Sequence, residues 1–312
     1  MRIVVLGSAA GGGFPQWNSN MPACRRARAG DGNAKPRTQA SLAVSVDDES
    51  WFLLNAAPDL RVQIDANEQL WPRQGLRSSP VAGVILTGGD VDAVAGLLTL
   101  RERHPFVLCA TPEVHAVLAE NSIFRVLAPD CVERRVLRLE KPLELAGPGA
   151  GPGTGAATLV VTAFAVPGKV ALWLEEPGRE PGIHEDGRTV GLEILDKASG
   201  ARCFFIPGCA AMTPALAQRL RGAKLVFFDG TLWRDDEMIR LGVGAKTGQR
   251  MGHMSMAGDD GVIAAFRDLA VARKIFIHIN NTNPVLLEDS PERAAAMAAG
   301  WTVAHDGLEL TL

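Results

Sequence analysis

The feature that most constrains this chain is a repeated pattern in which an apolar run of strand length stops at polar or small residues. Each run is rich in β-branched and aromatic residues, as buried strands are. Ligand sites in layered α/β proteins gather beyond the carboxyl ends of such strands, so one shared site can draw on all of them. The runs and the clusters that follow them span residues 51–59, 84–92, 204–209, 225–231 and 275–283.

The remaining apolar runs predict two similar halves, because the order of elements starts again after the Gly/Pro-rich residues 146–155. We expect two mixed sheets packed face to face with helices outside. Residues 147–155 are predicted to form a surface loop, and residues 175–188 a lid or rim. The predicted strands span residues 3–6, 42–45, 51–54, 84–87, 107–110, 159–164, 190–195, 203–206, 225–228, 274–279 and 308–312, and the predicted helices 92–102, 111–119, 214–221, 261–270 and 291–299.

Charge and hydropathy exclude several classes of protein. The 32 Lys and Arg residues against 35 Asp and Glu give a net charge of -3, which excludes the strongly basic face that non-specific nucleic-acid binding needs. The apolar runs fall short of the ~20 residues that span a bilayer, and residues 3–6 are too few for the apolar region of a signal peptide. The five cysteines form no Cys-x-x-Cys pair. We therefore expect a cytoplasmic protein without disulfides or membrane partners.

Three acidic or imidazole side chains follow the predicted strands closely enough to form a site. Asp90 and Asp92 are two residues apart, which places both carboxylates on one side of an extended segment and favours a metal ion. The alternative is that Asp92 caps the helix that begins there. His278 ends a fully apolar strand and precedes Asn280 and Asn281, although a lone histidine there is also typical of a core position.

Three further features have both a functional and a local structural interpretation. His253 lies in a loop of small residues, where contact with substrate and support of another site residue both fit. Asp229 is followed by Gly230 and Thr231, which is also the pattern of an Asx turn. The glycine-rich residues 7–18 follow a strand and either wrap backbone amides around an anion or make a tight turn. They lack the spacing of nucleotide-binding loops.

Long motifs in order along the chain span residues 5–18, 36–39, 55–61, 229–238, 242–244, 246–248, 251–253 and 277–284. Together they resemble the PqqB family of pyrroloquinoline quinone (PQQ) biosynthesis. This resemblance implies one metallo-β-lactamase-like domain over residues 1–312, an α/β protein in the form of a four-layer αββα sandwich. That architecture agrees with the two halves expected above.

The superfamily's metal motif, Thr-His-x-His-x-Asp-His, aligns with residues 86–93 of this chain. Its two leading histidines fall on Gly88 and Asp90, its aspartate on Asp92 and its last histidine on Ala93. The final histidine of the superfamily falls on His278. The resemblance therefore implies that the first metal position is lost.

PqqB proteins generally keep an aspartate and two histidines, a set that suits non-haem Fe(II). In this chain only Asp92 and His278 remain, because Ala93 replaces the second histidine. We expect Fe(II) to bind weakly or not at all unless another residue joins them. The residues available for that are Asp90, Asp229 and Cys209, the last of which falls near a bridging aspartate of the superfamily.

The family also often has three cysteines after its Trp-Asn motif, which form a structural zinc site. Ser19 and Met21 take two of those places here and leave only Cys24. One thiolate does not make a closed tetrahedral site, so we expect no structural zinc.

The resemblance implies an iron- and oxygen-dependent hydroxylase that acts on a cross-linked Glu-Tyr precursor of PQQ. Asp92 and His278, with Asp90, would hold the metal, and Asp229 and His253 would serve beside them. The alternative is a carrier of PQQ or its precursor, which Ala93 favours because a carrier needs no metal. A dinuclear zinc hydrolase is a third interpretation, which the loss of histidines at positions 88 and 90 disfavours.

Either ligand carries several carboxylates, so the pocket of an acidic chain must supply cations or amide donors. Each predicted cation is equally well explained as a solvated surface charge. A second copy of the chain is a further partner compatible with the sequence. The residues predicted to bind the ligand are Arg61, Lys169, Lys246, Arg250, Asn280 and Asn281, together with the backbone amides of Gly11, Gly12 and Gly13.

Overall fold

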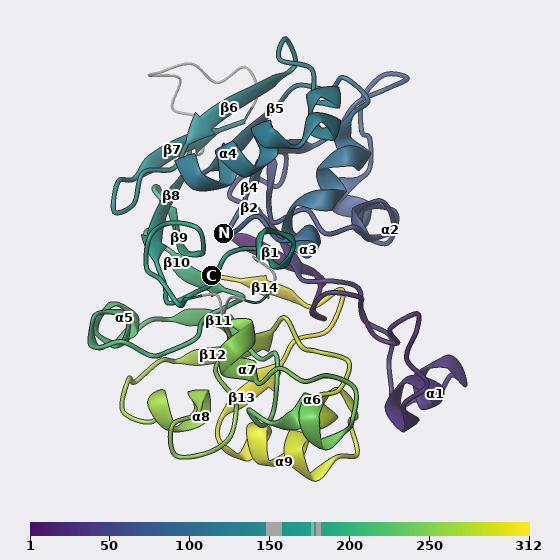
Figure 1. The fold of residues 1–312 in the computed structure, drawn as a ribbon. Helices are drawn as coiled ribbons and strands as arrows, with labels where there is room; N and C mark the ends of the chain where they lie inside the picture. Colours follow the sequence, from purple (N-terminus) through teal and green to yellow (C-terminus); the bar gives the residue numbers. More distant parts are fainter. Residues whose placement is uncertain (148–157, 176–177, 179–181) are drawn as a thin grey trace.

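The computed structural model describes residues 1–147, 158–175, 178 and 182–312, and folds them into two seven-stranded sheets (Figure 1). Nearly all of the predicted loop 147–155 and part of the predicted lid 175–188 lie outside the described residues. The two sheets pack face to face, and helices cover their outer surfaces. The predicted αββα sandwich is confirmed.

The first sheet has the strand order β14-β1-β2-β3-β4-β5-β6. Strands β1 to β3 pair antiparallel, and β3 to β6 pair parallel. The strands are β1 (Arg2–Gly7), β2 (Ser41–Ser45), β3 (Trp51–Leu54), β4 (Val81–Ile85), β5 (Phe106–Ala110), β6 (Val132–Val136) and β14 (Glu309–Thr311).

The second sheet repeats this plan in the order β13-β12-β11-β10-β9-β8-β7. Strands β7 to β10 pair antiparallel, and β10 to β13 pair parallel. The prediction of two similar halves is therefore confirmed. The strands are β7 (Leu143–Ala146), β8 (Thr158–Ala165), β9 (Val190–Asp196), β10 (Arg202–Ile206), β11 (Leu225–Asp229), β12 (Arg273–Ile277) and β13 (Trp301–Val303).

Alternation along each strand builds the layers. Ile3 and Val5 of β1 point into the core between the sheets, whereas Val4 points to the outer core of the first sheet. In β11, Phe227 lies between the sheets and Phe228 under the helices of the second sheet. Because both faces of these strands are buried, they appear in the sequence as continuous apolar runs.

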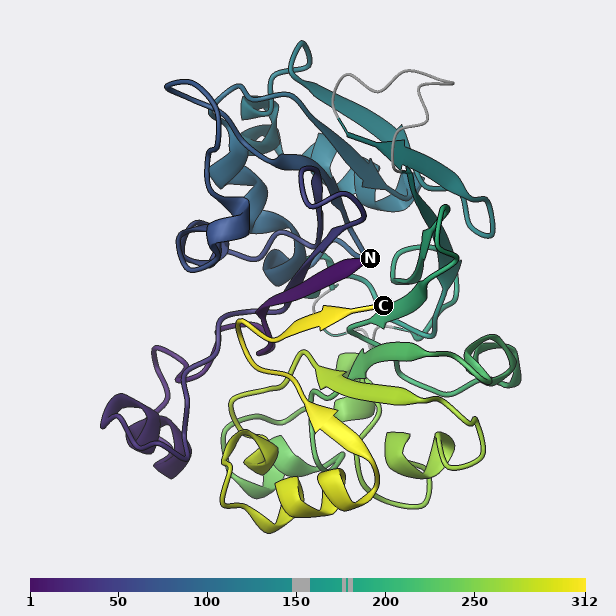
Figure 2. The same ribbon diagram turned by 180° about the vertical axis from the view of Figure 1, so that it is seen from behind.

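Helices cover both outer faces, with α2 to α4 on the first sheet and α5, α8 and α9 on the second (Figures 1 and 2). The α-helices are α1 (Pro22–Arg28), α2 (Leu60–Asp65), α3 (Val91–Val94), α4 (Pro112–Glu120), α5 (Pro214–Leu220), α6 (Glu237–Arg240), α7 (Gly248–Met251), α8 (Val262–Ala265) and α9 (Pro291–Ala298). The 3-10 helices are η1 (Glu68–Leu70), η2 (Ala95–Leu100), η3 (Ser122–Val126), η4 (Leu172–Leu174) and η5 (Pro284–Leu286).

The sequence prediction missed three strands and the short helices α1, α2, α6 and α7, and it made two other helices too long. The missed strands β6, β7 and β13 are all sheet edges, where one side of the strand lacks a partner and the apolar signal is weak. The predicted helix 92–102 is a single α-helical turn, α3, followed by the 3-10 helix η2, and the predicted helix 261–270 shortens to α8. No helix among the described residues is long and apolar enough to cross a membrane.

Candidate functional site

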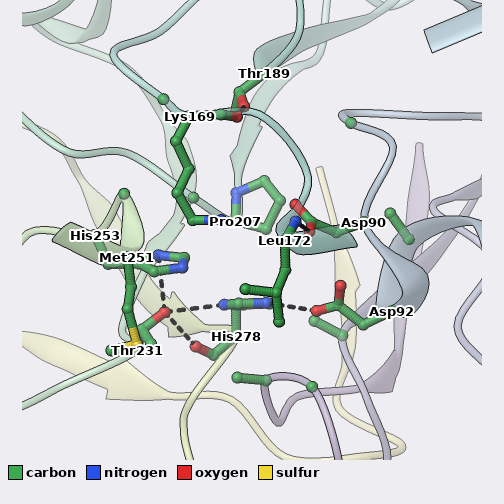
Figure 3. Close-up of a pocket in the computed structure, with 18 of the residues that line it drawn as sticks. Asp90, Asp92, Lys169, Leu172, Thr189, Pro207, Thr231, Met251, His253 and His278 are labelled. Atoms are coloured by element: carbon green, nitrogen blue, oxygen red, sulfur yellow. Dashed lines mark hydrogen bonds and ion pairs between the residues drawn. The ribbon is translucent and has the colours of Figure 1, made fainter. Parts of the chain in front are cut away.

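The carboxyl ends of β3, β4, β10, β11 and β12 all line one cavity of about 450 Å³ (Figure 3). The structure thus brings together the five strand ends that the sequence pattern singled out. The lining residues that these ends contribute include Asn55, Thr87, Gly88, Asp90, Asp92, Pro207, Gly208, Thr231, His278 and Asn280.

His278 lies at the centre of the cavity wall because the chain turns sharply there. Strand β12 ends at Ile277, and His278 has a φ of 59°, a left-handed conformation that cannot continue a strand. The predicted strand 274–279 was therefore too long. The turn directs the imidazole toward Asp92, whose Oδ2 lies 2.8 Å from Nε2, while Nδ1 lies 2.9 Å from Thr231 Oγ1.

Asp90 and Asp92 enter the cavity at the start of α3. Asp90 takes the N-cap position and Asp92 the first turn, so the alternative in which Asp92 caps the helix is wrong. Asp90 Oδ1 instead accepts a hydrogen bond of 3.0 Å from the backbone N–H of Leu172. The two carboxylates therefore have different partners, a backbone amide for Asp90 and an imidazole for Asp92.

The charges of this group are set by burial and by the short contact between Asp92 and His278. Burial opposes ionisation of both side chains, but their hydrogen bond outweighs it, which raises the pKa of His278 and lowers the pKa of Asp92. The two form a carboxylate–imidazolium pair. For Asp90, burial and then the negative charge of Asp92 raise the pKa of the carboxyl.

Asp229 organises the other side of the site. Its Oδ1 accepts from the backbone N–H of Thr231 at 3.0 Å, which is the predicted Asx turn, and from the Thr231 hydroxyl at 2.7 Å. Its Oδ2 accepts from the Cys209 N–H at 2.9 Å and lies 2.7 Å from His253 Nδ1. The turn and the site contact are thus made by one fully buried carboxylate.

Counting protons fixes the roles in this network. A carboxylate only accepts, so the Thr231 hydroxyl donates to Asp229 and His253 Nδ1–H donates to the same carboxylate. His278 Nδ1–H then donates to the Thr231 oxygen. The His253 ring stacks on that of His278 with centroids 5.2 Å apart, and its Nε2 has no hydrogen-bond partner among the described residues. His253 lines the cavity with this nitrogen unpaired among the described side chains.

The ligand atoms that lie close together differ from the metal set that the resemblance implies. Asp229, His253 and His278 each offer one atom within 4.8 Å of the others, and this donor set suits zinc as well as iron. However, the Thr231 hydroxyl contacts all three side chains. At the implied position, Asp92 and His278 bond directly to each other, and Ala93 adds only a methyl group. The implied Asp–His–His set is incomplete.

Cys209 and Cys24 do not supply the missing ligand. Burial raises the pKa of the Cys209 thiol to about 12, and its Sγ lies 3.2 Å from the Ala211 carbonyl oxygen, so the thiolate that binds metals is disfavoured. Cys24 is buried in α1 with its thiol 3.7 Å from Asn281 Oδ1.

The predicted ligand-binding residues divide into two groups. Asn280, Lys169 and Lys246 line the cavity, whereas Arg61, Asn281 and Arg250 are not among its lining residues. Arg61 is 76% exposed and pairs with Asp65 on its own helix. Asn281 Nδ2 bonds to Gln16.

The glycine-rich turn is not a free anion cradle. The N–H of Gly12 donates to Gln39 Oε1, and that of Gly13 donates to the Ala10 carbonyl oxygen, so two of the three predicted amide donors are used within the protein. Gly11 does line the cavity. A side chain at Gly11 would cover Asp92, because its Cβ would lie 3.9 Å from Asp92 Oδ2. The glycine therefore leaves this carboxylate accessible from the cavity.

Two contributors to the site had little signal in the sequence. Thr231 was part of a noted cluster, but nothing local shows that its hydroxyl links both histidines. Asn55 adopts a φ of 64° directly after β3, as His278 does after β12, and its side chain bonds to Thr87. An asparagine at a strand end before Ala-Ala-Pro is the signal from which this turn could have been predicted.

Comparison with known proteins agrees with this architecture. Residues 50–279 match the model of the Beta-lactamase superfamily domain. The chain is 60% identical to coenzyme PQQ synthesis protein B of Gluconacetobacter diazotrophicus over 99% of both chains. It superposes on the crystal structure of Zn(2+)-bound PqqB from Methylobacterium extorquens with a TM-score of 0.93, at 53% identity and with full coverage of both chains.

A more distant structure shares the fold alone. A diphosphatase of the PhnP family superposes with a TM-score of 0.66 at 18% identity, over 100% of this chain and 97% of the other. The two mixed sheets, the site at their strand ends and the full-length identity lead to one conclusion. The chain belongs to the coenzyme PQQ synthesis protein B family, within the beta-lactamase superfamily.

Proposed function

We propose that this chain acts in PQQ biosynthesis by holding PQQ or its precursor in the cavity, as a carrier. The observation that supports this most is the presence of two lysines, Lys169 and Lys246, in the cavity wall of a chain whose net charge is -3. Ammonium groups are the donors that a ligand with several carboxylates requires. The chain belongs to the coenzyme PQQ synthesis protein B family, and this membership is the reason for choosing PQQ or its precursor as the ligand.

The rest of the wall suits a ligand that is both planar and polar. Leu172, Met238 and Met251 offer apolar surface to a ring, and Asn280 and Thr189 add polar atoms to the wall. The carboxylates of Asp90 and Asp92 lie across the cavity from Lys169 (Figure 3). A polycarboxylate is therefore expected to bind with its acidic groups toward the lysines.

Calorimetric titration with PQQ tests the carrier function. We expect the parent protein to bind PQQ and Lys246→Ala to weaken binding about tenfold, because a partly desolvated charge pair is lost. Lys197→Ala is the matched control, since Lys197 is an exposed lysine that pairs with Glu144 outside the cavity. Absence of binding by the parent protein contradicts the carrier function.

The iron- and oxygen-dependent hydroxylase is the second candidate, favoured by the position of Asp92 and His278 in the wall of the same cavity. A metal bound there would supply oxygen chemistry, and these two residues would hold it. Metal analysis and turnover of a cross-linked Glu-Tyr peptide with Fe(II) and oxygen test this function. Product formed only with iron supports it, and a protein without iron or turnover that still binds PQQ supports the carrier.

A cytoplasmic location and a homodimer stay predictions.

A further inference from the structure

Both lysines of the cavity wall are already occupied by one acidic residue. Glu175 Oε1 lies 2.9 Å from Lys169 Nζ, and Glu175 Oε2 lies 2.8 Å from Lys246 Nζ. Each oxygen of the carboxylate thus faces a different ammonium group. This is the arrangement that a carboxylate of a ligand would adopt in the same place.

The three side chains differ in exposure. The side chains of Lys169 and Glu175 are 10% and 12% exposed, whereas that of Lys246 is 33% exposed. Burial opposes ionisation of Glu175, but the hydrogen bonds from Lys246 and Lys169 outweigh it and keep the pKa of the carboxyl below its usual range. Because the contact with Lys246 is the better hydrated of the two, it is the one that opens at lower cost.

We propose that Glu175 is a resident carboxylate that neutralises the two lysines of the cavity wall from the side of a second, neighbouring cavity and is displaced from Lys246 when a carboxylate-bearing ligand binds. The inference rests on the proposed function for the identity of the ligand, and makes Glu175 a residue that sets affinity. With Glu175 in place the group carries one net positive charge, whereas without it two ammonium groups face the ligand.

The surroundings of Glu175 leave room for this exchange. Residues 170–175 separate the cavity from a second cavity of about 860 Å³. Leu172 faces the first cavity and Glu175 the second. The segment is held from the other side by the Leu172 N–H on Asp90 and by Trp173 Nε1 on the Gly89 carbonyl oxygen. The Glu175 side chain can therefore move without loss of these anchors.

The test uses Glu175→Gln and a simple probe, benzene-1,3,5-tricarboxylate, in calorimetric titrations of the whole protein. We expect the variant to bind the probe about fivefold more tightly than the parent, because the competing charge is gone and both ammonium groups are available. Lys246→Met should then cost more affinity in the Glu175→Gln background than in the parent. Glu144→Gln, which removes an equal charge from an exposed pair, should leave affinity unchanged.

Equal or weaker binding of the probe by Glu175→Gln overturns the inference, because a carboxylate that only holds the lysines in place would lower the affinity when it is removed. No measurable binding by either protein also overturns it. Glu175→Ala is the second variant, and thermal melts of both show whether they are folded. Titration with PQQ separates the two proposals. If PQQ fails to bind while the probe binds more tightly to Glu175→Gln, the proposed ligand is wrong and the role of Glu175 stands.

Discussion

The two halves of the molecule share one topology but contribute to the cavity in different ways. The second half supplies Asp229, Thr231, His253 and His278, and the bonds of Asp229 all stay within that half. The first half supplies Asp90 and Asp92, whose side chains bond to Leu172 and His278 across the boundary. The second half therefore carries a preformed network, whereas the acids of the first half are positioned by packing of the halves against each other.

The largest effect that separates the halves is expected on stability. Asp229→Ala should lower the free energy of unfolding by about 3 kcal/mol, because three N–H donors lose their acceptor in a fully buried place. Asp90→Ala, the matched change in the first half, should cost less than about 1 kcal/mol, since the carboxyl that it removes is destabilised by burial. Urea unfolding measures both, and equal losses would show that the two halves do not differ in this way.

The next effect concerns metal binding. Ala93→His should raise affinity for Fe(II) or Zn²⁺ at least about tenfold, because a third ligand on the same helical turn adds a bond at little ordering cost. Competition with a chelator and metal analysis measure the change. His278→Ala in the same background should reverse it. Equal metal content in the parent and Ala93→His proteins would show that the loss at position 93 does not limit binding.

The smallest effect is a pH dependence of the contact between the halves. The pKa of Asp92 is lowered and that of His278 is raised. The ion pair therefore stabilises the fold by about 1 kcal/mol at pH values between the ordinary pKa of an aspartate and that of a histidine. This contribution is lost as pH falls through the pKa of Asp92 and as pH rises through that of His278. We expect Asp92→Asn to remove it, measured by urea unfolding of chelator-treated protein. A difference between parent and variant that is constant with pH would refute this assignment.

Much of the fold was predictable because most strands are buried on both faces. Their apolar runs located β1 to β5 and β8 to β12. The edge strand β6 buries only its first residue, Val132, and its sequence Val-Glu-Arg-Arg-Val resembles a polar loop. Strand ends were harder to place, because a turn such as that at His278 depends on backbone conformation and not on hydropathy.

The site was predictable where a strand end carried the functional group, and not where a contact crossed the sheets. Asp92 and His278 are 186 positions apart, and only the packing of the two halves shows that they touch. Glu175 lies in a polar loop whose sequence does not indicate two lysine partners. Arg61 shows the opposite error. It was predicted to bind the ligand because it lies in a family motif, but its side chain lies on an exposed face of α2.

The strand β14 has a consequence for how the protein is made. It pairs with β1, and the N-terminal ammonium group donates to the Leu312 carbonyl oxygen at 3.0 Å (Figure 2). The first sheet therefore takes an edge strand from residues 309–311, which are synthesised after all strands of the second sheet. The N-terminal half cannot complete its sheet until β14 has been synthesised, so the edge of β1 stays open while the second half is made. Joining the adjacent termini and opening the chain at a surface loop would change that order of assembly while keeping the fold.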